Sequence, residues 1–343
     1  MGKTSVVKKM HRESPGPLTF FQDLERVHNA LEFVEEVLHQ VREHLTRRQR
    51  ALQRFHDVLK AIGGAEVGGV LTVPEGLRPH WKALLVSLIE DLMSQQPGLV
   101  VFFWDEFPQM LHNIAKEEPR DAMEILDTLR SLRQQHEQLR MVLTGSIGLH
   151  TVLAALQRQG HRNAAKNDIL SVTLPPLDAE DAVALARALL EGESVRADST
   201  DVVAREIAGE VGNVPFYIHQ VVGCMRGKIV QSGTARSIVG EGLRDPHDPW
   251  ELRHYKTRID HDYEGEDRPY ALAILDALSV SEAPLRFSDL MARVKAQPGV
   301  TDDERARAVL DFLQQDHYIV KTSDGYAFRT PLIARWWRSY RHD

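Results

Sequence analysis

A continuous apolar run that ends in two acids constrains the fold of this chain more than any other feature. The run spans Leu99–Trp104, and Asp105 and Glu106 follow directly. An uninterrupted apolar stretch is typical of a strand buried on both faces, as in a parallel sheet. Further strands are expected over residues 18–24, 139–144 and 169–174. Because these strands alternate with helical patterns, the sequence predicts an α/β core with a parallel sheet between two layers of helices.

The first five residues match the second half of a phosphate-binding loop. Gly2-Lys3-Thr4 supplies the last three positions of G-x-x-x-x-G-K-[ST], and Ser5 can begin the helix that follows such a loop. The strand, the first glycine and most of the loop are missing from this chain. Either the match is accidental, or the chain starts inside its own nucleotide site.

The acids after the apolar run are the second candidate for chemistry. In open α/β sheets, ligands bind at the carboxyl ends of the strands, where Asp105 and Glu106 are expected. Nucleotide hydrolysis needs Mg²⁺ held by a hydroxyl and a carboxylate, and a group that orients water. Thr4 and Asp105 suit the first task, Glu106 suits the second, and Lys3 would neutralise phosphate charge. The alternative is that both acids simply end a strand in water.

Polar residues also follow the strand expected at 139–144. Thr144 and Ser146 are candidates to contact the attacking water or the γ-phosphate. The alternative is that their hydroxyls satisfy local backbone groups. Further along, residues 212–216 form a helix-breaking turn that contains Pro215, a candidate contact to a nucleotide base.

The rest of the chain is predicted to be mostly helical. A long amphipathic helix is expected over residues 29–61, and residues 179–232 are expected to be helices only, capped by Asp178. A linker is expected at 245–249. Residues 268–343 are predicted to form three helices and a β-hairpin, the element order of a winged helix. The predicted domains are a core over 1–176, a helical lid over 177–245, and a linker helix with a winged-helix domain over 246–343.

Charge argues against nucleic acid as the main partner. The net charge is −7, and the would-be recognition helix over 302–315 carries four acids against two arginines. A basic and aromatic end does exist, comprising Arg329, Arg335, Trp336, Trp337, Arg338, Tyr340 and Arg341. It is expected to pack rather than to stack on bases. The single cysteine excludes an internal disulfide, and the lack of a long apolar run or a signal peptide makes the cytoplasm the expected location.

Taken in order, these motifs resemble the AAA+/STAND class of P-loop NTPases, specifically the archaeal-type ATPase family. The resemblance spans nearly the whole chain and rests on motifs in the same order as in that family. They are Gly2-Lys3-Thr4-Ser5, Trp104-Asp105-Glu106, Leu143-Thr144-Gly145-Ser146, Leu174-Pro175-Pro176-Leu177, Gly212-Asn213-Val214-Pro215 and Phe328-Arg329-Thr330-Pro331-Leu332-Ile333.

The resemblance implies an ATP site with Mg²⁺. It implies that Asp105 is the Mg²⁺ carboxylate, Glu106 the base that activates water, and Thr144 or Ser146 the sensor of the γ-phosphate. Pro215 would contact adenine, and Arg162 is the candidate to complete a neighbouring subunit's site. The expected function is ATP hydrolysis that switches a surface for a protein partner or for self-association. The alternative is a regulator that senses nucleotide without hydrolysis and binds protein or DNA.

The front of the chain departs from the family. There, the strand before the phosphate loop lies between the strands expected here at 139–144 and 169–174. Its loss leaves a gap of about 10 Å that a folded sheet must close or fill. We therefore expect the gene product to begin upstream of Met1, and this chain by itself to bind nucleotide weakly.

Overall fold

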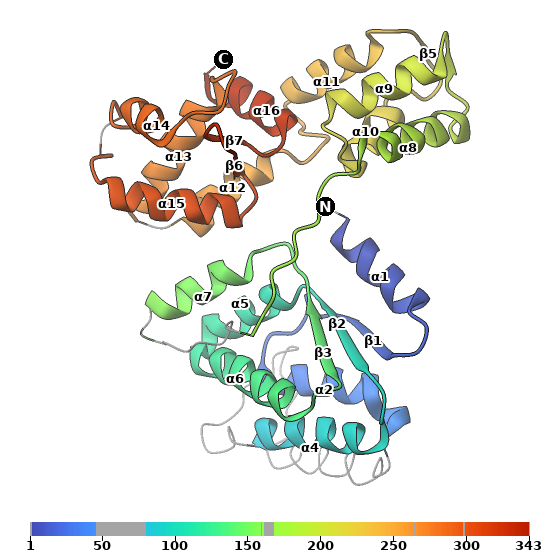
Figure 1. Cartoon of the computed structure of the whole chain (residues 1–343), viewed down its shortest axis with the longest axis vertical. Helices are drawn as coiled ribbons and strands as arrows, with labels where there is room; N and C mark the ends of the chain where they lie inside the picture. Colours follow the sequence, from blue (N-terminus) through green and yellow to red (C-terminus); the bar gives the residue numbers. More distant parts are fainter. Residues whose placement is uncertain are drawn as a thin grey trace. The chain divides into compact units, whose positions relative to one another are not determined.

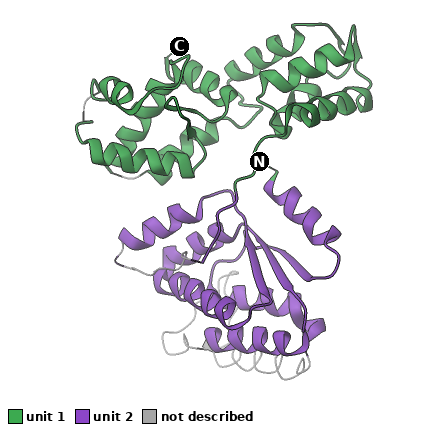
Figure 2. Ribbon diagram, in the orientation of Figure 1, with its two compact units in different colours: residues 1–2, 173–343 green, residues 3–172 purple. Residues whose placement is uncertain are grey.

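The computed structural model describes residues 2–45, 80–158, 160, 168–263, 265–297 and 299–342. The chain divides into two compact units (Figure 2). The first, which we call the sheet unit, comprises residues 3–172. The second, the helical unit, comprises residues 1–2 and 173–343. No helix among the described residues has the length and apolar character needed to cross a membrane.

The sheet unit is built on a parallel sheet, as the sequence predicts. Its strands are β1 (Leu18–Asp23), β2 (Val100–Asp105) and β3 (Leu139–Leu143), in the order β1-β2-β3 (Figure 1). Asp23 lies opposite Asp105 in the register, and Trp104 lies opposite Leu143. The carboxyl ends of the strands therefore meet at one edge of the sheet.

Side chains of β2 alternate between two apolar layers, which explains why the whole run is apolar. Phe102 and Trp104 face helices α2 (Ala30–Val41), α4 (His80–Gln95), α5 (Phe107–Glu117) and α6 (Pro119–Gln135). Val101 and Phe103 face the other way and pack with Val7 of α1 (Lys3–Glu13). Aromatic rings stack on the larger layer, with 5.0 Å between the ring centroids of Phe20 and Phe102. Each such pair contributes about 0.5–1.5 kcal/mol beyond area burial. Helix α7 (Leu149–Arg158) packs beside α5.

Two predictions for this unit are wrong. Residues 169–174 are not a strand, and Leu170 and Val172 are 86% and 84% exposed. A strand forms only when it is hydrogen-bonded to a neighbouring strand. Among the described residues, no strand pairs with the edge of β3 that faces away from β2. The helix predicted over 29–61 begins after Asn29, whose side chain accepts a hydrogen bond from the Glu32 amide. It ends at Val41, where a 3₁₀ turn, η1 (Arg42–His44), follows; residues 46–61 lie outside the described residues.

The helical unit contains the predicted order of helices and hairpin. The helices are α8 (Ala179–Gly192), α9 (Thr200–Glu210), α10 (Pro215–Gly223), α11 (Thr234–Arg244), α12 (Arg253–Asp262), α13 (Asp267–Ser279), α14 (Phe287–Val294), α15 (Asp303–Gln315) and α16 (Pro331–His342). Strands β6 (Ile319–Lys321) and β7 (Tyr326–Phe328) form the predicted antiparallel hairpin. Asp178 caps α8 as predicted, because its carboxylate accepts from the Asp181 amide at 2.8 Å.

The prediction of helices only over 179–232 is wrong in one respect. Two short strands, β4 (Arg196–Ala197) and β5 (Ile229–Val230), pair in parallel. Each has only two residues. A two-residue strand is too short to produce a period-2 pattern that the sequence would show.

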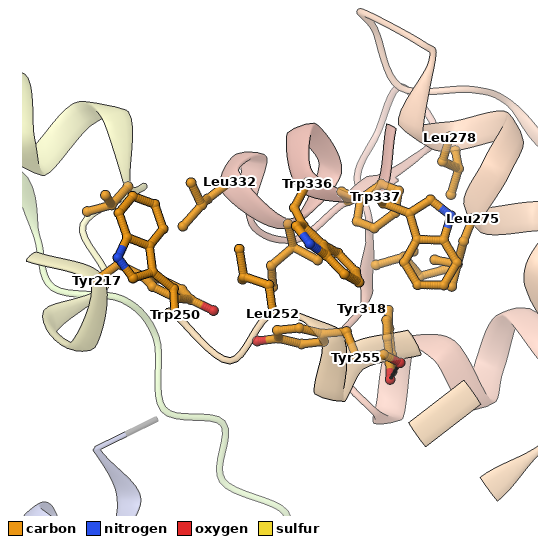
Figure 3. Close-up of a cluster of buried hydrophobic side chains, with 14 of the residues drawn as sticks. Tyr217, Trp250, Leu252, Tyr255, Leu275, Leu278, Tyr318, Leu332, Trp336 and Trp337 are labelled. Carbon is orange, nitrogen blue, oxygen red and sulfur yellow. Dashed lines mark hydrogen bonds between the residues drawn. The ribbon is translucent and has the colours of Figure 1, made fainter. Parts of the chain in front are cut away.

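One apolar core runs through the helical unit from α8 to α16. Figure 3 shows its central part, where Trp250 and Leu252 lie between Tyr217 of α10 and Trp336 of α16. The predicted boundary between lid and winged-helix domain, at 245/246, falls within the residues that share this core. That division stays a prediction.

The two tryptophans of the basic and aromatic end pack inside this unit, whereas Tyr340 is 49% exposed. Trp336 and Trp337 are buried, and the arginines around them bind acceptors of the same unit. Arg335 pairs with Glu210 at 2.6 Å, and Arg341 pairs with the Asp276 carboxylate at 2.8 Å. Arg338 donates to the carbonyl of Ser279. These arginines are therefore held by protein acceptors.

Glu210 joins three helices of this core and makes its stability depend on pH. Its carboxylate accepts from Arg236 at 2.9 Å and from Arg335. Burial raises the pKa of the Glu210 carboxyl, but the hydrogen bonds and charges of the two arginines outweigh burial, so its pKa lies below the usual value. A carboxyl whose folded-state pKa is lowered adds stability above its unfolded-state pKa and loses it as the pH falls through the folded-state pKa.

We expect Glu210→Gln to lower the free energy of unfolding at pH 7, and this deficit to shrink below about pH 4.3, the ordinary pKa of glutamate. Urea unfolding at pH 7 and pH 3.5 measures both values. Glu282→Gln, at an exposed glutamate of the same unit, is the matched control. A deficit that stays the same at both pH values would show that the charge of Glu210 does not stabilise the fold.

Candidate functional site

The carboxyl ends of β2 and β3 bring the predicted acidic and hydroxyl residues together. Asp105 ends β2 with 2% of its surface exposed, and Thr144 follows β3. The Thr144 amide donates to the Trp104 carbonyl at 3.0 Å, and the Phe107 amide donates to the Thr144 carbonyl at 3.1 Å. The β2–β3 ladder therefore continues past the last residue of β3. As a result, the Thr144 hydroxyl donates to the Asp105 carboxylate at 2.5 Å.

Glu106 adopts a backbone conformation that is rare for its residue type. Its φ is 54° and its ψ is 26°, in the left-handed region, at the residue that precedes α5. For a residue other than glycine this costs roughly 1 kcal/mol or more, which the surroundings must offset. The carboxylate oxygen Oε2 accepts from the Ser146 amide at 2.9 Å and from the Ser146 hydroxyl at 2.8 Å. Hydrogen bonds to a charged acceptor are among the stronger ones, and these two hold the side chain.

Gly145 allows this close approach, and sequence reasoning missed its role. A Cβ built on Gly145 would lie 2.7 Å from Cδ of Pro108, in the first turn of α5, and 3.5 Å from Oε2 of Glu106. Any larger residue would therefore push the end of β3 away from α5. The signal in the sequence was the glycine between two hydroxyl residues, since a glycine at a strand end often marks close backbone approach.

Lys3 joins the same cluster from the amino end of α1. Its ammonium donates to the Gly145 carbonyl. Helix α1 is held on the sheet by Val7 and by His11, whose ring shares a 2.8 Å hydrogen bond with Thr19 of β1. We call Lys3, Asp105, Glu106, Thr144, Gly145 and Ser146 the strand-end site.

The other predicted residues are not joined to this cluster by hydrogen bonds between described residues. Thr4 and Ser5 lie in the first turn of α1, where Thr4 is half-buried and Ser5 exposed. Gly2 and Pro215 belong to the helical unit, and their predicted roles stay predictions. Pro215 begins α10, after a turn in which Gly212 and Asn213 both have positive φ, so the predicted helix-breaking turn is confirmed. Arg162 lies outside the described residues.

The donors of the strand-end site fit a magnesium ion that also binds phosphate. Within the described ranges, no group of three or more His, Cys, Asp or Glu side chains could hold a metal alone. Mg²⁺ prefers oxygen ligands, and it commonly takes one or two carboxylates from the protein and the rest from phosphates and water. Asp105 could supply one such carboxylate. The Thr4 hydroxyl, the second ligand predicted from the sequence, is not part of the strand-end site, and its role stays a prediction. This small set of protein donors fits a metal ion that takes most of its other ligands from a bound nucleotide and water.

The comparisons with known proteins bear on the fold. No protein-family model matches the chain, and no curated protein matches it in sequence. Among solved structures, the chain is similar to a Walker-type ATPase of Pyrococcus abyssi, with a TM-score of 0.60, 15% identity, and coverage of 98% of this chain and 88% of that one.

It is also similar to the ORC2 protein of Aeropyrum pernix, a structure of ADPNP–ADP complexes. That match has a TM-score of 0.50 and 12% identity, and it covers 100% of this chain and 86% of the other. Identities this low carry the fold and no residue's role. The chain therefore shares its α/β fold with these two structures.

Proposed function

We propose that the protein binds ATP with Mg²⁺ at the strand-end site and hydrolyses it. The convergence of Lys3, Asp105 and Glu106 at the carboxyl edge of a parallel sheet is the observation that supports this most. Such edges are where ligands bind in α/β folds. The similarity to a Walker-type ATPase adds support at the level of the fold. Mg²⁺, when bound, would neutralise charge on the transferred phosphate.

Each residue of the site has a task in this proposal. Asp105 and Thr4 would hold the metal, and Lys3 would exchange its contact with the Gly145 carbonyl for one with the β- and γ-phosphates. The amides of Lys3, Thr4 and Ser5 in the first turn of α1, with that of Gly2 just before it, would point at phosphate, helped by the helix dipole. Glu106 accepts a proton from a water molecule while the oxygen of that water attacks the γ-phosphorus. The bond between the γ-phosphorus and the leaving oxygen of ADP breaks.

We further propose that hydrolysis acts as a conformational switch. In this proposal residues 177–245 are a lid in which Pro215 contacts adenine, and residues 246–343 are a linker helix and a winged helix. Binding of ATP rather than ADP would shift the population of a surface that a protein partner or a second copy recognises. The arginines of α16 are bound to Glu210, Asp276 and Ser279, which supports a role in packing over one in DNA binding.

The second candidate is a nucleotide sensor without turnover. One observation favours it: Glu106 Oε2 already accepts from both donors of Ser146. In this candidate the Glu106 carboxylate serves only as an acceptor for Ser146 and takes no proton from water.

Phosphate release and equilibrium binding of ATP distinguish these candidates. We expect Mg²⁺-dependent ATP hydrolysis by this chain or by the chain extended to the next upstream in-frame start. Asp105→Asn keeps an acceptor for Thr144 but loses the charge, so it is expected to weaken MgATP binding at least about tenfold, or 1.4 kcal/mol. Asp324→Asn, at an exposed aspartate of the hairpin turn, is the matched control. Binding without hydrolysis would favour the sensor, and no binding by either chain would reject both candidates.

A further inference from the structure

Three consecutive residues after β3 each hold one charged group of the strand-end site. Thr144 donates to Asp105, the Gly145 carbonyl accepts from Lys3, and Ser146 donates to Glu106. The contact of Ser146 differs from the others because two donors, the amide and the hydroxyl, meet the same oxygen. This geometry orients the carboxylate as well as binding it.

We propose that Ser146 is the positioning residue for Glu106: it fixes the orientation of the carboxylate and does not itself contact the γ-phosphate. The proposal rests on the proposed function, since it assigns how the same site is organised. Within the described residues, Oε1 of Glu106 has no hydrogen-bond partner, whereas Oε2 has two. Ser146 therefore holds one oxygen while the other is free to accept a proton from water.

The backbone that carries Ser146 is itself fixed, which a positioning residue requires. The Thr144 amide and carbonyl bind the backbone of β2 and α5 on either side of Glu106. Gly145 is buried against Pro108, with no room for a side chain. The segment that carries the two donors of Ser146 is thus bonded to the backbone on both sides of Glu106. A small displacement of a reacting group lowers the rate of the reaction, so a fixed backbone next to Glu106 favours catalysis.

The direct alternative is that the Ser146 hydroxyl binds the γ-phosphate. A serine hydroxyl has a single hydrogen to donate, and here it is donated to Glu106. Contact with phosphate would require Ser146 to give up that bond and leave the glutamate with the amide alone. The two roles therefore exclude each other and can be separated by mutation.

A double-mutant cycle of Ser146→Ala and Glu106→Ala separates them. We expect Ser146→Ala alone to lower kcat about tenfold and to leave the dissociation constants of ATP and ADP unchanged. Ser146→Thr, which keeps the hydroxyl, should restore most of kcat. In the Glu106→Ala background, Ser146→Ala should change nothing further. A loss of ATP affinity relative to ADP, by the same factor in both backgrounds, would overturn the proposal and make Ser146 a phosphate contact.

Hydrogen exchange tests the contact without any nucleotide. The Ser146 amide donates to the Glu106 carboxylate, whereas the Thr144 amide donates to the Trp104 carbonyl. Glu106→Ala is therefore expected to speed exchange at Ser146 and leave Thr144 unchanged, with Glu137→Ala, at an exposed glutamate, as the control. Unchanged exchange at Ser146 would overturn the proposal. If no ATP is bound or hydrolysed, the proposed function fails, and the exchange result alone decides for or against the contact.

Discussion

Replacing Glu106 by glutamine is expected to lower kcat for ATP hydrolysis at least about a hundredfold while ATP still binds, because positioned general bases contribute 10²–10⁴ in rate. Glutamine has the same length, and its carbonyl oxygen can accept from Ser146 as the carboxylate oxygen does. It also keeps a side chain at a position whose φ is 54°. What it loses is the capacity to take a proton from water.

The measurement is phosphate release at saturating ATP, with ATP binding followed separately. Glu137→Gln, an exposed glutamate outside the strand-end site, is the control and should behave as wild type. Hydrolysis that survives in Glu106→Gln would remove Glu106 from the role of base. Loss of ATP binding in the same variant would instead assign Glu106 to the architecture of the site.

The largest effect on stability is expected from Asp316→Ala, at about 3–5 kcal/mol of unfolding free energy. Asp316 follows α15 and is 7% exposed. Its carboxylate accepts from Arg258 at 3.0 Å and from the Tyr263 hydroxyl at 2.8 Å, so it joins α15 to α12 and the residue after it. Alanine would leave the buried Tyr263 hydroxyl without its acceptor and the half-buried Arg258 guanidinium without its closest carboxylate.

Urea unfolding followed by tryptophan fluorescence measures this loss, because Trp250, Trp336 and Trp337 lie in the same core. Asp311→Ala is the matched control, since Asp311 lies on the same helix but is exposed, and its expected effect is within about 0.5 kcal/mol. A loss below about 1 kcal/mol for Asp316→Ala would mean that desolvation of the pair cancels its attraction.

Most of the secondary structure could be predicted from the sequence because it is encoded by local patterns. The apolar run before Asp105 became β2, and the hairpin around residues 319–328 and the cap at Asp178 lie where predicted. These features depend on residues close together in the chain. The strand predicted at 169–174 is not formed, although its local sequence is suitable for one. Its formation requires a neighbouring strand, and no such strand is present among the described residues.

The sequence predicted some residues of the candidate site but none of their contacts, and the roles of these residues stay predictions. Lys3, Asp105, Glu106, Thr144 and Ser146 were identified by residue type and by position at strand ends, and all lie in the strand-end site. That Ser146 binds Glu106, and that Gly145 must lack a side chain against Pro108, depended on the distance between β3 and α5. Residue spacing along the chain carries no information on that distance.

By itself, the sequence determined that β2 is a strand buried on both faces, that acids and hydroxyl residues follow β2 and β3, and where several helices begin. It could do so because burial periodicity and capping are properties of neighbouring residues. Only the tertiary structure decided the pairing of strands and the partner of each polar group at the sheet edge. It also decided that a single core runs from α8 to α16. These are contacts between residues far apart in the chain, and they form only when the packing of whole layers brings those residues together.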